Sequence, residues 1–121
     1  MPTRDVVEAF IAQVVSGDHV GAIRDHYAEN ATMQENNAAP RVGRALLMEQ
    51  EARTLARAKS VKTHAVEDFA IDGDTVFIRW IFEFERPDGT VMRMEEVALQ
   101  TWSADQIVRE RFFYDPAQMA S

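Results

Sequence analysis

Cysteine is absent from this 121-residue chain, which excludes a disulfide framework and a thiolate metal site. The three histidines, His19, His26 and His64, have no metal-ligand spacing among them, so we expect no metal or other cofactor. Basic residues are also in deficit, because 13 Lys and Arg stand against 20 Asp and Glu, a formal charge of −7. Such a chain repels phosphate backbones, which argues against a nucleic-acid partner.

Long hydrophobic runs are lacking as well. No window approaches the roughly 20 apolar residues of a membrane-spanning helix. The opening segment MPTRDVVEAF has neither the apolar region of a secretion signal nor an Arg-rich transit pattern. We therefore expect a cytoplasmic protein with no membrane partner.

A hydrophobic fraction of 46% and a charged fraction of 27%, without repeats, predict one domain over residues 1–121 that is large enough for a core and a pocket.

Helical periodicity dominates the first half of the chain. Thr3 is a candidate N-cap, and hydrophobic residues recur at helical spacing from Val6 to Val15. A shorter helix through Val20, Ile23 and Tyr27, a strand near 31–35 and a third helix over about 43–58 follow. Beyond Ser60 the pattern predicts strands over 61–71, 75–85, 90–102 and 107–114, separated by turn sequences. Three helices before an antiparallel meander predict an α+β domain with helices on one face of the sheet.

Two stretches carry a resemblance to a known family. The closing segment ALQTWSADQIVRERFFYDPAQM and the opening segments VVEAFIAQVVSGD and HYAENATMQEN are similar to the matching parts of SnoaL-like proteins. These proteins belong to the NTF2-like superfamily, which also contains ketosteroid isomerases. The resemblance implies an NTF2-like (cystatin-like) cone, in which three N-terminal helices pack on a curved antiparallel sheet.

The resemblance also implies a function for the pocket of that cone. It implies that the pocket binds a small, mostly apolar organic molecule and performs cofactor-free acid–base chemistry such as isomerisation, cyclisation or dehydration. The alternative is a non-catalytic ligand-binding or dimerisation module, because one scaffold of this kind carries many functions.

Three residues match catalytic positions of such families. Asp115 resembles the acid–base aspartate near the end of the last strand in SnoaL-type cyclases. Arg79 matches the arginine of limonene epoxide hydrolases, and Glu35 falls on the general base of the isomerases. Each residue also has a structural alternative. Asp115 can begin a turn at Pro116, Arg79 can pair with Glu96 across two strands, and Glu35 can belong to a solvated loop.

The two oxyanion donors of the isomerases are missing at their usual positions. The phenol would fall on Phe10 and the protonated acid near Ala98, and neither side chain can donate a hydrogen bond. Loss of one such donor costs roughly 10²- to 10³-fold in rate. We therefore expect little ketosteroid isomerisation unless other groups replace these donors.

Strand pairing predicts which residues share a face. Pairing without bulges across Pro87-Asp88 and across Ala104-Asp105 places Arg79, Ala98 and Asp115 together. This predicted pocket also contains Phe10, Tyr27, Met94, Glu96, Arg111 and Phe113. The opposite face is more apolar and carries Trp80, Phe82, Phe84, Leu99 and Phe112. Hydrophobicity alone would turn that face toward the helices, but we expect it to form a homodimer interface. A single β-bulge would reverse part of this assignment.

Overall fold

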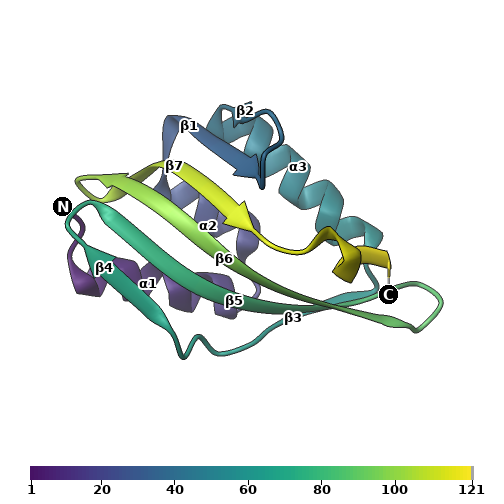
Figure 1. Cartoon of the computed structure of the whole chain (residues 1–121). Coiled ribbons are helices and arrows are strands. Elements are labelled where there is room, and N and C mark those ends of the chain that lie inside the picture. Colours follow the sequence, from purple (N-terminus) through teal and green to yellow (C-terminus); the bar gives the residue numbers. More distant parts are fainter. Residues whose placement is uncertain (121) are drawn as a thin grey trace.

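The structure, a computed structural model, describes residues 1–120 and consists of helices packed on a curved sheet (Figure 1). In chain order the elements are α1 (Arg4–Val15), α2 (His19–His26), β1 (Tyr27–Glu35), β2 (Arg41–Val42), α3 (Arg44–Arg57), β3 (Ser60–Thr63), β4 (Phe69–Asp72), β5 (Thr75–Glu85), β6 (Val91–Ser103), β7 (Gln106–Phe113) and the 3₁₀ helix η1 (Pro116–Ala120). The three predicted helices are confirmed, except that α2 ends at His26 and Tyr27, predicted as helical, begins β1. The predicted strand over 61–71 is divided into β3 and β4, which pair with different parts of β5.

Local sequence explains where the helices begin. The Thr3 side chain accepts a hydrogen bond from the Val6 amide and thus caps α1, as predicted. Asp18 caps α2 in the same way, through the Gly21 amide. Gly43, which precedes α3, has a φ of 108°, a backbone conformation that disfavours residues with a Cβ. These caps leave the apolar sides of α1 and α2 free to pack on the sheet.

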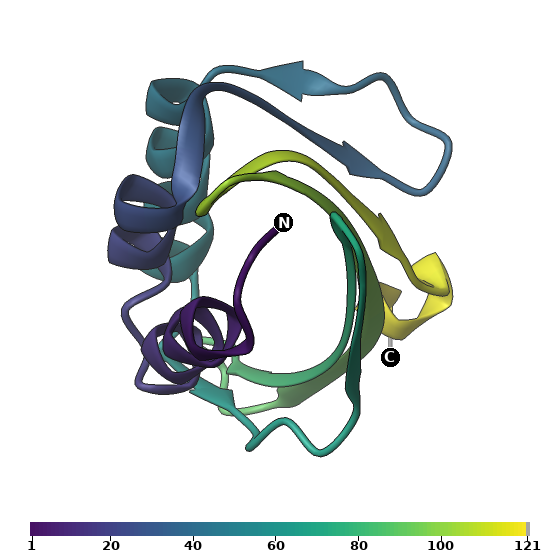
Figure 2. The same ribbon diagram turned by 90° about the vertical axis from the view of Figure 1, so that its left-hand side faces the viewer.

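The sheet has the strand order β2-β1-β7-β6-β5-β3, with β4 also paired to β5. The meander β5-β6-β7 is antiparallel as predicted, whereas β1 pairs with β7 in parallel, so the sheet is mixed. Viewed along the molecule, the sheet curves around and the three helices lie along its open side (Figure 2). The hydrophobic core lies between helices and sheet and includes Phe10, Leu47, Ile78, Trp80 and Trp102.

The register of β5 against β6 differs from the prediction by one residue. Glu96 lies opposite Trp80, not opposite Arg79. The reason is the turn, in which the Arg86 amide donates to the Thr90 carbonyl around a three-residue loop. Gly89 supplies the positive φ, 87°, that such a loop needs. A three-residue loop in place of the assumed two-residue loop changes which side chains of β5 and β6 share a face.

A β-bulge changes the faces of β7 as well. The predicted two-residue turn at 104–105 is present, and Trp102 pairs with Ile107 as expected. The register then shifts between Thr101 and Trp102, so that Ala98 lies opposite Phe112, not opposite Arg111. Arg111 and Phe113 therefore leave the face on which the sequence analysis placed them.

These two shifts define an inner face, turned toward the helices, and an outer face. The inner face carries Val76, Ile78, Trp80, Phe82 and Phe84 of β5, Met92, Met94, Glu96, Ala98 and Gln100 of β6, and Glu110 and Phe112 of β7. The predicted dimer face was thus wrong: Trp80, Phe82 and Phe112 lie inside the molecule. The outer face carries Phe77, Arg79, Glu95, Val97, Leu99, Arg111 and Phe113.

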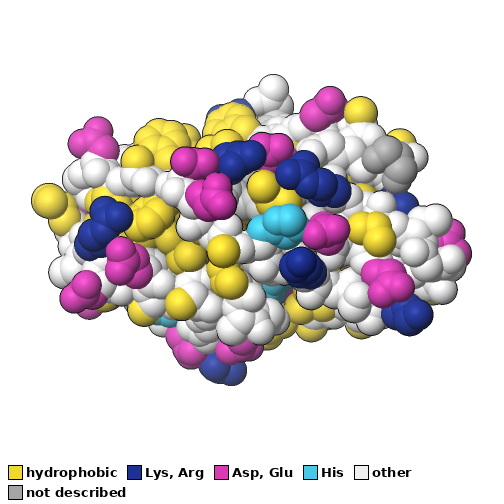
Figure 3. Space-filling view, turned by 90° about the horizontal axis from the view of Figure 1, so that it is seen from below, with side chains coloured by type: hydrophobic (Ala, Val, Ile, Leu, Met, Phe, Trp, Pro, Cys, Tyr) yellow, Lys and Arg dark blue, Asp and Glu magenta, His cyan; other side chains and the backbone are white. Residues whose placement is uncertain are grey.

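The edge of the sheet at β3 and β4 is flanked by charged side chains. Figure 3 shows the molecule from below, where acidic and basic side chains are interspersed with hydrophobic ones. Near this edge Lys59 lies 3.7 Å from Glu85, and Asp68 lies 3.2 Å from Arg79. Charged side chains of this kind protect an edge strand from pairing with another chain.

Candidate functional site

A cavity of about 450 Å³ lies between the inner face and the helices. This volume is within the usual range for sites that hold small organic molecules, roughly 300–1,000 Å³. Residues from α1, α2 and α3 form one side of its wall, and residues from β1, β5, β6 and β7 form the other. Tyr27 and Glu110, both 3% exposed, mark the buried end of the cavity. Arg57, Arg86 and Met119 belong to α3, the β5–β6 hairpin and η1, whose ends come together in Figure 1.

The β5 side of the cavity is a row of three aromatic rings. Trp80, Phe82 and Phe84 are alternate residues of one strand, so their side chains project from the same face. The ring centroids of Trp80 and Phe82 are 5.7 Å apart with an interplanar angle of 23°, and those of Phe82 and Phe84 are 6.2 Å apart. Met92 and Met94 on the neighbouring strand extend this wall. The wall therefore suits an apolar or aromatic molecule.

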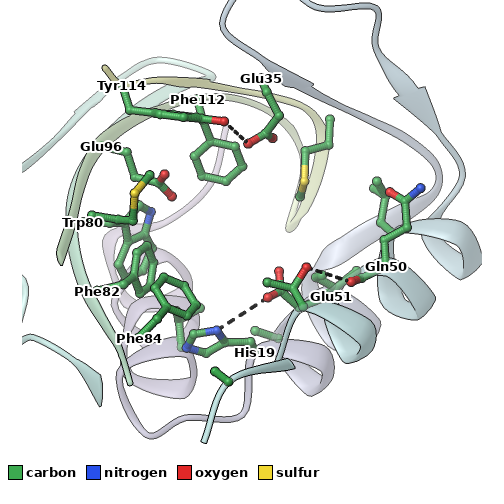
Figure 4. A pocket seen from close by; sticks show the side chains of 18 of the residues that line it. His19, Glu35, Gln50, Glu51, Trp80, Phe82, Phe84, Glu96, Phe112 and Tyr114 are labelled. Atoms are coloured by element: carbon green, nitrogen blue, oxygen red, sulfur yellow. Dashed lines mark hydrogen bonds and ion pairs between the residues drawn. The ribbon is translucent and has the colours of Figure 1, made fainter. Parts of the chain in front are cut away.

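Glu96 introduces a carboxyl group into this apolar wall. It is the cross-strand partner of Trp80, and its side chain points into the cavity (Figure 4). Among residues 1–120 no group hydrogen-bonds to it or forms an ion pair with it. Burial raises the pKa of this carboxyl to about 8, and repulsion from Glu35, Glu110 and Glu51 adds to the rise. Glu96 is therefore mainly protonated at neutral pH in the empty cavity.

Glu35 enters the cavity from the end of β1 and is held by two donors. The Tyr114 hydroxyl donates to Glu35 Oε1 at 3.2 Å, and Arg41 Nη2 donates to Oε2 at 2.8 Å. Arg41 Nη1 also donates to Gln50 Oε1, which joins β2 to α3. Burial and the charge of Glu35 raise the pKa of Tyr114 to about 12, so its phenol is a stable hydrogen-bond donor.

His19 and Glu51 lie on the helical side, across the cavity from Glu96 (Figure 4). His19 Nε2 is 2.8 Å from Thr63 Oγ1, and His19 Nδ1 is 3.8 Å from Glu51 Oε1. The His19 ring also meets Phe82 edge-on, with centroids 5.6 Å apart. These contacts hold a polar group against the aromatic row.

A buried polar chain closes the inner end of the cavity. Tyr27 donates its hydroxyl proton to one oxygen of Glu110, and Gln100 Nε2 donates to the other at 2.6 Å. Trp102 Nε1 donates in turn to Gln100 Oε1 at 3.0 Å. Burial raises the pKa of Glu110 to about 7, although both hydrogen bonds act in the opposite direction. Each member of the chain has a partner, as buried polar groups require.

Five of the predicted site residues line the cavity. Phe10, Tyr27, Glu35, Met94 and Glu96 all contribute to its wall. Ala98 also lies on the inner face, but it is fully buried in the core and does not line the cavity. The cross-strand pairing of Arg79 with Glu96 is wrong, because Trp80 occupies that place.

Arg79 and Asp115, two of the predicted catalytic residues, lie away from the cavity. Arg79 is on the outer face, where its guanidinium contacts Glu95 at 2.7 Å and Asp68 at 3.2 Å. Asp115 is exposed and its carboxylate accepts a hydrogen bond from the Ala117 amide at 2.9 Å, at the beginning of η1. The predicted convergence of these two residues with Ala98 is thus wrong, for the register reasons given above.

Arg111 and Phe113, predicted as pocket residues, are also on the outer face. The Arg111 guanidinium lies 4.7 Å from the centroid of the Phe113 ring, and its Nε donates to the Asn36 carbonyl. Arg111 therefore anchors the loop after β1. Phe113 is 41% exposed.

Sequence reasoning missed several lining residues, among them the acidic Glu51 and Glu110. Glu51 follows buried Leu47 by four residues in α3, so helical spacing already puts both on one side. Glu110 lies between Arg109 and Arg111, and only the bulge reveals that it faces inward.

Within residues 1–120 no group of three or more His, Cys, Asp or Glu side chains is arranged to hold a metal ion. No helix of this part of the chain is long and apolar enough to cross a membrane.

Comparison with known proteins gives one family. The profile of the SnoaL-like domain matches residues 7–110. No curated protein sequence matches significantly.

Solved structures share the fold at low sequence identity. A proposed SnoaL-like polyketide cyclase from Mesorhizobium loti has 24% identity and a TM-score of 0.74 over 91% of this chain and 97% of its own. A Catenulispora acidiphila protein with a ketosteroid isomerase-like fold, in complex with trimethylamine, has 20% identity and a TM-score of 0.79, covering 96% and 89%. A Xanthomonas campestris protein with a cystatin-like fold has 19% identity and a TM-score of 0.82, covering 98% and 95%. The predicted α+β cone is confirmed.

Proposed function

Since the chain belongs to the SnoaL-like domain family, we propose that its cavity binds a small, mostly apolar organic molecule and transfers protons on it without a cofactor. The observation that carries this proposal is the Glu96 carboxyl, which faces the cavity beside Trp80 without a partner among residues 1–120. A carboxyl whose pKa is near the working pH can both give and take a proton, and the pKa of Glu96 is raised to about 8.

Two donors in the cavity serve the role that Phe10 and Ala98 cannot fill. Protonated Glu96 donates to the oxygen of a bound carbonyl group, and the Tyr114 phenol does so when its proton turns away from Glu35, which keeps Arg41 as a partner. Glu35 is the second carboxylate and takes a proton from the neighbouring carbon. Return of that proton to another carbon completes an isomerisation, and both glutamates end in their starting states. In this scheme Glu96 takes the place that the sequence analysis gave to Asp115.

The proposal is tested by proton exchange on a panel of cyclic β,γ- and α,β-unsaturated ketones. We expect the protein to catalyse deuterium incorporation from D2O at the carbon next to the carbonyl, followed by proton NMR. Glu96→Gln should slow this exchange by about 10²-fold or more, the usual contribution of a general acid or base. Glu95→Gln is the matched control, because Glu95 is the adjacent residue but lies on the outer face.

The alternative function, a binding module without catalysis, has a distinct outcome in the same assay. It predicts that panel compounds raise the melting temperature while no exchange occurs. The complex of the Catenulispora protein with trimethylamine supports a small organic ligand for a fold of this kind.

We also propose that the protein is a homodimer, now through the outer face. Phe77, Val97 and Phe113 share this face and are 42%, 38% and 41% exposed, and exposed hydrophobic side chains that gather on one face often mark a protein–protein contact. Sedimentation at micromolar concentration should give twice the chain mass of 13.7 kDa. Val97→Glu should shift the protein to the monomer, and a monomeric wild type would contradict the proposal.

A further inference from the structure

We propose that the ligand of the cavity carries a positively charged nitrogen, as a protonated amine or a quaternary ammonium group, held against the aromatic row and beside Glu96. This inference rests on the proposed function only in assuming that a small organic molecule occupies the cavity. It concerns the charge of that molecule, which the proposed function leaves open.

The first support is the composition of the wall beside Glu96. Trp80 and Phe82 line the cavity with nearly parallel rings, and Phe84 continues the row. Aromatic rings attract cations through their negative π faces, and desolvated pairs of this kind are the stronger ones. Glu96 stands opposite Trp80 in the antiparallel ladder, so a cation against this ring is also within reach of its carboxyl group. The aromatic row and the Glu96 carboxylate thus both favour a positively charged ligand.

The second support is the imbalance of charge inside the cavity. Glu35, Glu51 and Glu96 direct their carboxyl groups inward from three different elements, β1, α3 and β6 (Figure 4). Arg41 is already bonded to Glu35. Arg57 and Arg86 lie at the far end of α3 and in the β5–β6 hairpin.

No basic side chain of residues 1–120 therefore stands close to Glu96, and the nearest base to Glu51 is His19, at 3.8 Å. Low-dielectric walls concentrate the field of such a cavity. A ligand cation supplies the positive charge that the chain does not place there.

The charge of the ligand also sets the protonation of Glu96. In the empty cavity this carboxyl is held mainly in its neutral form, for the reasons given above. A cation within a few ångströms favours the ionised form and lowers the pKa. Binding of a cation at pH 7 must then release a proton from Glu96, whereas binding of a neutral molecule must not. The same event converts Glu96 from an acid into a base, so in a cationic complex Glu96 takes up a proton and the Tyr114 phenol is left as the donor to a carbonyl oxygen.

The test compares two molecules of equal shape, 3-hydroxyphenyltrimethylammonium and 3-tert-butylphenol, by isothermal titration calorimetry. The trimethylammonium compound should bind at least about tenfold more tightly at low salt, and this advantage should shrink as salt is added. Titrations at pH 7 in two buffers with different ionisation enthalpies should show proton release for the cation alone. The Glu96→Gln variant should lose both the advantage and the proton release, whereas Glu95→Gln should keep them. Circular dichroism checks that each variant is folded.

Three results would overturn the inference. Equal affinity for both compounds without proton release would show that the cavity takes neutral molecules, and the proposed function would stand. If neither compound binds, both the inference of a cationic ligand and the proposal that the cavity binds molecules of this size are contradicted. Preference for the cation that survives unchanged in Glu96→Gln would place the cation elsewhere.

Discussion

The inner and outer faces of the sheet use the same residue types for different purposes. Glu95 and Glu96 are adjacent in β6 and face opposite sides. On the outer face the Arg79 guanidinium beside Glu95 lowers the pKa of that carboxyl below its usual range. On the inner face burial raises the pKa of Glu96 to about 8. Successive side chains of a strand point to opposite faces of the sheet. Two adjacent glutamates therefore differ: Glu95 forms a structural ion pair, and Glu96 is a reactive carboxyl group.

Aromatic residues show the same contrast. Trp80 is 2% exposed and contacts Phe10 and Phe82, whereas Phe77 is 42% exposed on the outer face. The inner rings both stabilise the fold and line the cavity, while the outer ring does neither in a single chain. Each prediction below compares two residues of the same kind in different surroundings, or one such residue with Glu96.

The largest effect is expected from truncation of the inner aromatic wall. Trp80→Ala should lower the free energy of unfolding by about 3–5 kcal/mol, because it removes buried ring contacts and leaves a larger void. Phe77→Ala, the matched change on the outer face, should cost less than about 1 kcal/mol in protein dilute enough to be monomeric, because Phe77 is 42% exposed in the single chain. Urea denaturation measures both values. Equal losses would show that Phe77 is buried in solution, as an interface between two copies requires.

The next effect concerns the buried polar chain. Tyr27→Phe removes a donor to Glu110 at a position that is 3% exposed, and should cost about 1–3 kcal/mol. Tyr114→Phe removes a similar bond to Glu35, which keeps Arg41 as a partner, and should cost less than about 1 kcal/mol. If both variants lost the same stability in urea, the contrast between the closed end of the cavity and its middle would be wrong.

A smaller effect is the pH dependence of stability. The folded-state pKa of Glu96 is about 8, above its ordinary value of 4.5, so the folded protein binds this proton more tightly than the unfolded chain does. The resulting stabilisation is complete below pH 4.5 and is lost as the pH rises toward 8. Relative to Glu96→Gln, wild type should therefore lose at least about 1 kcal/mol between pH 5 and 8. Urea unfolding across this range measures the difference.

The outer neighbour should show the opposite sign. The pKa of Glu95 is lowered by the hydrogen bond and charge of Arg79, so its stabilisation is present above the ordinary value of 4.5 and disappears as the pH falls. Wild type and Glu95→Gln should therefore become equally stable in acid. A difference between them that grew from pH 5 to pH 8 would contradict the assignment of the two faces.

The sequence predicts the elements of the fold better than it predicts their register. Helical spacing and the Thr3 cap suffice for α1, and turn residues suffice for the meander. Which side chains of β5, β6 and β7 face the helices depends on whether the β5–β6 turn has two or three residues and on one β-bulge. The interactions of a few side chains decide both features. Gly89, with its positive φ, was the available signal for the three-residue turn. The bulge near Trp102 left no comparable mark in the sequence.

The sequence predicted which site residues share a face within one strand, but not which residues of different strands lie side by side. Met94 and Glu96 share a face through alternation alone, and both line the cavity. The parallel pairing of β1 with β7, which places Glu35 near Tyr114, joins segments far apart in the sequence. No local pattern specifies such a pairing.

The smallest effect is expected at Asp115, the residue to which family resemblance gave the leading catalytic role. Its carboxylate is exposed and accepts from the Ala117 amide, outside the cavity. Asp115→Asn retains an oxygen that accepts this bond, so ligand affinity and proton-exchange rates should stay within about twofold of wild type, as for surface changes generally. The same assays on Glu96→Gln provide the contrast. A folded Asp115→Asn protein that loses exchange as completely as Glu96→Gln would return Asp115 to the mechanism, and would require η1 to move toward the cavity when ligand binds.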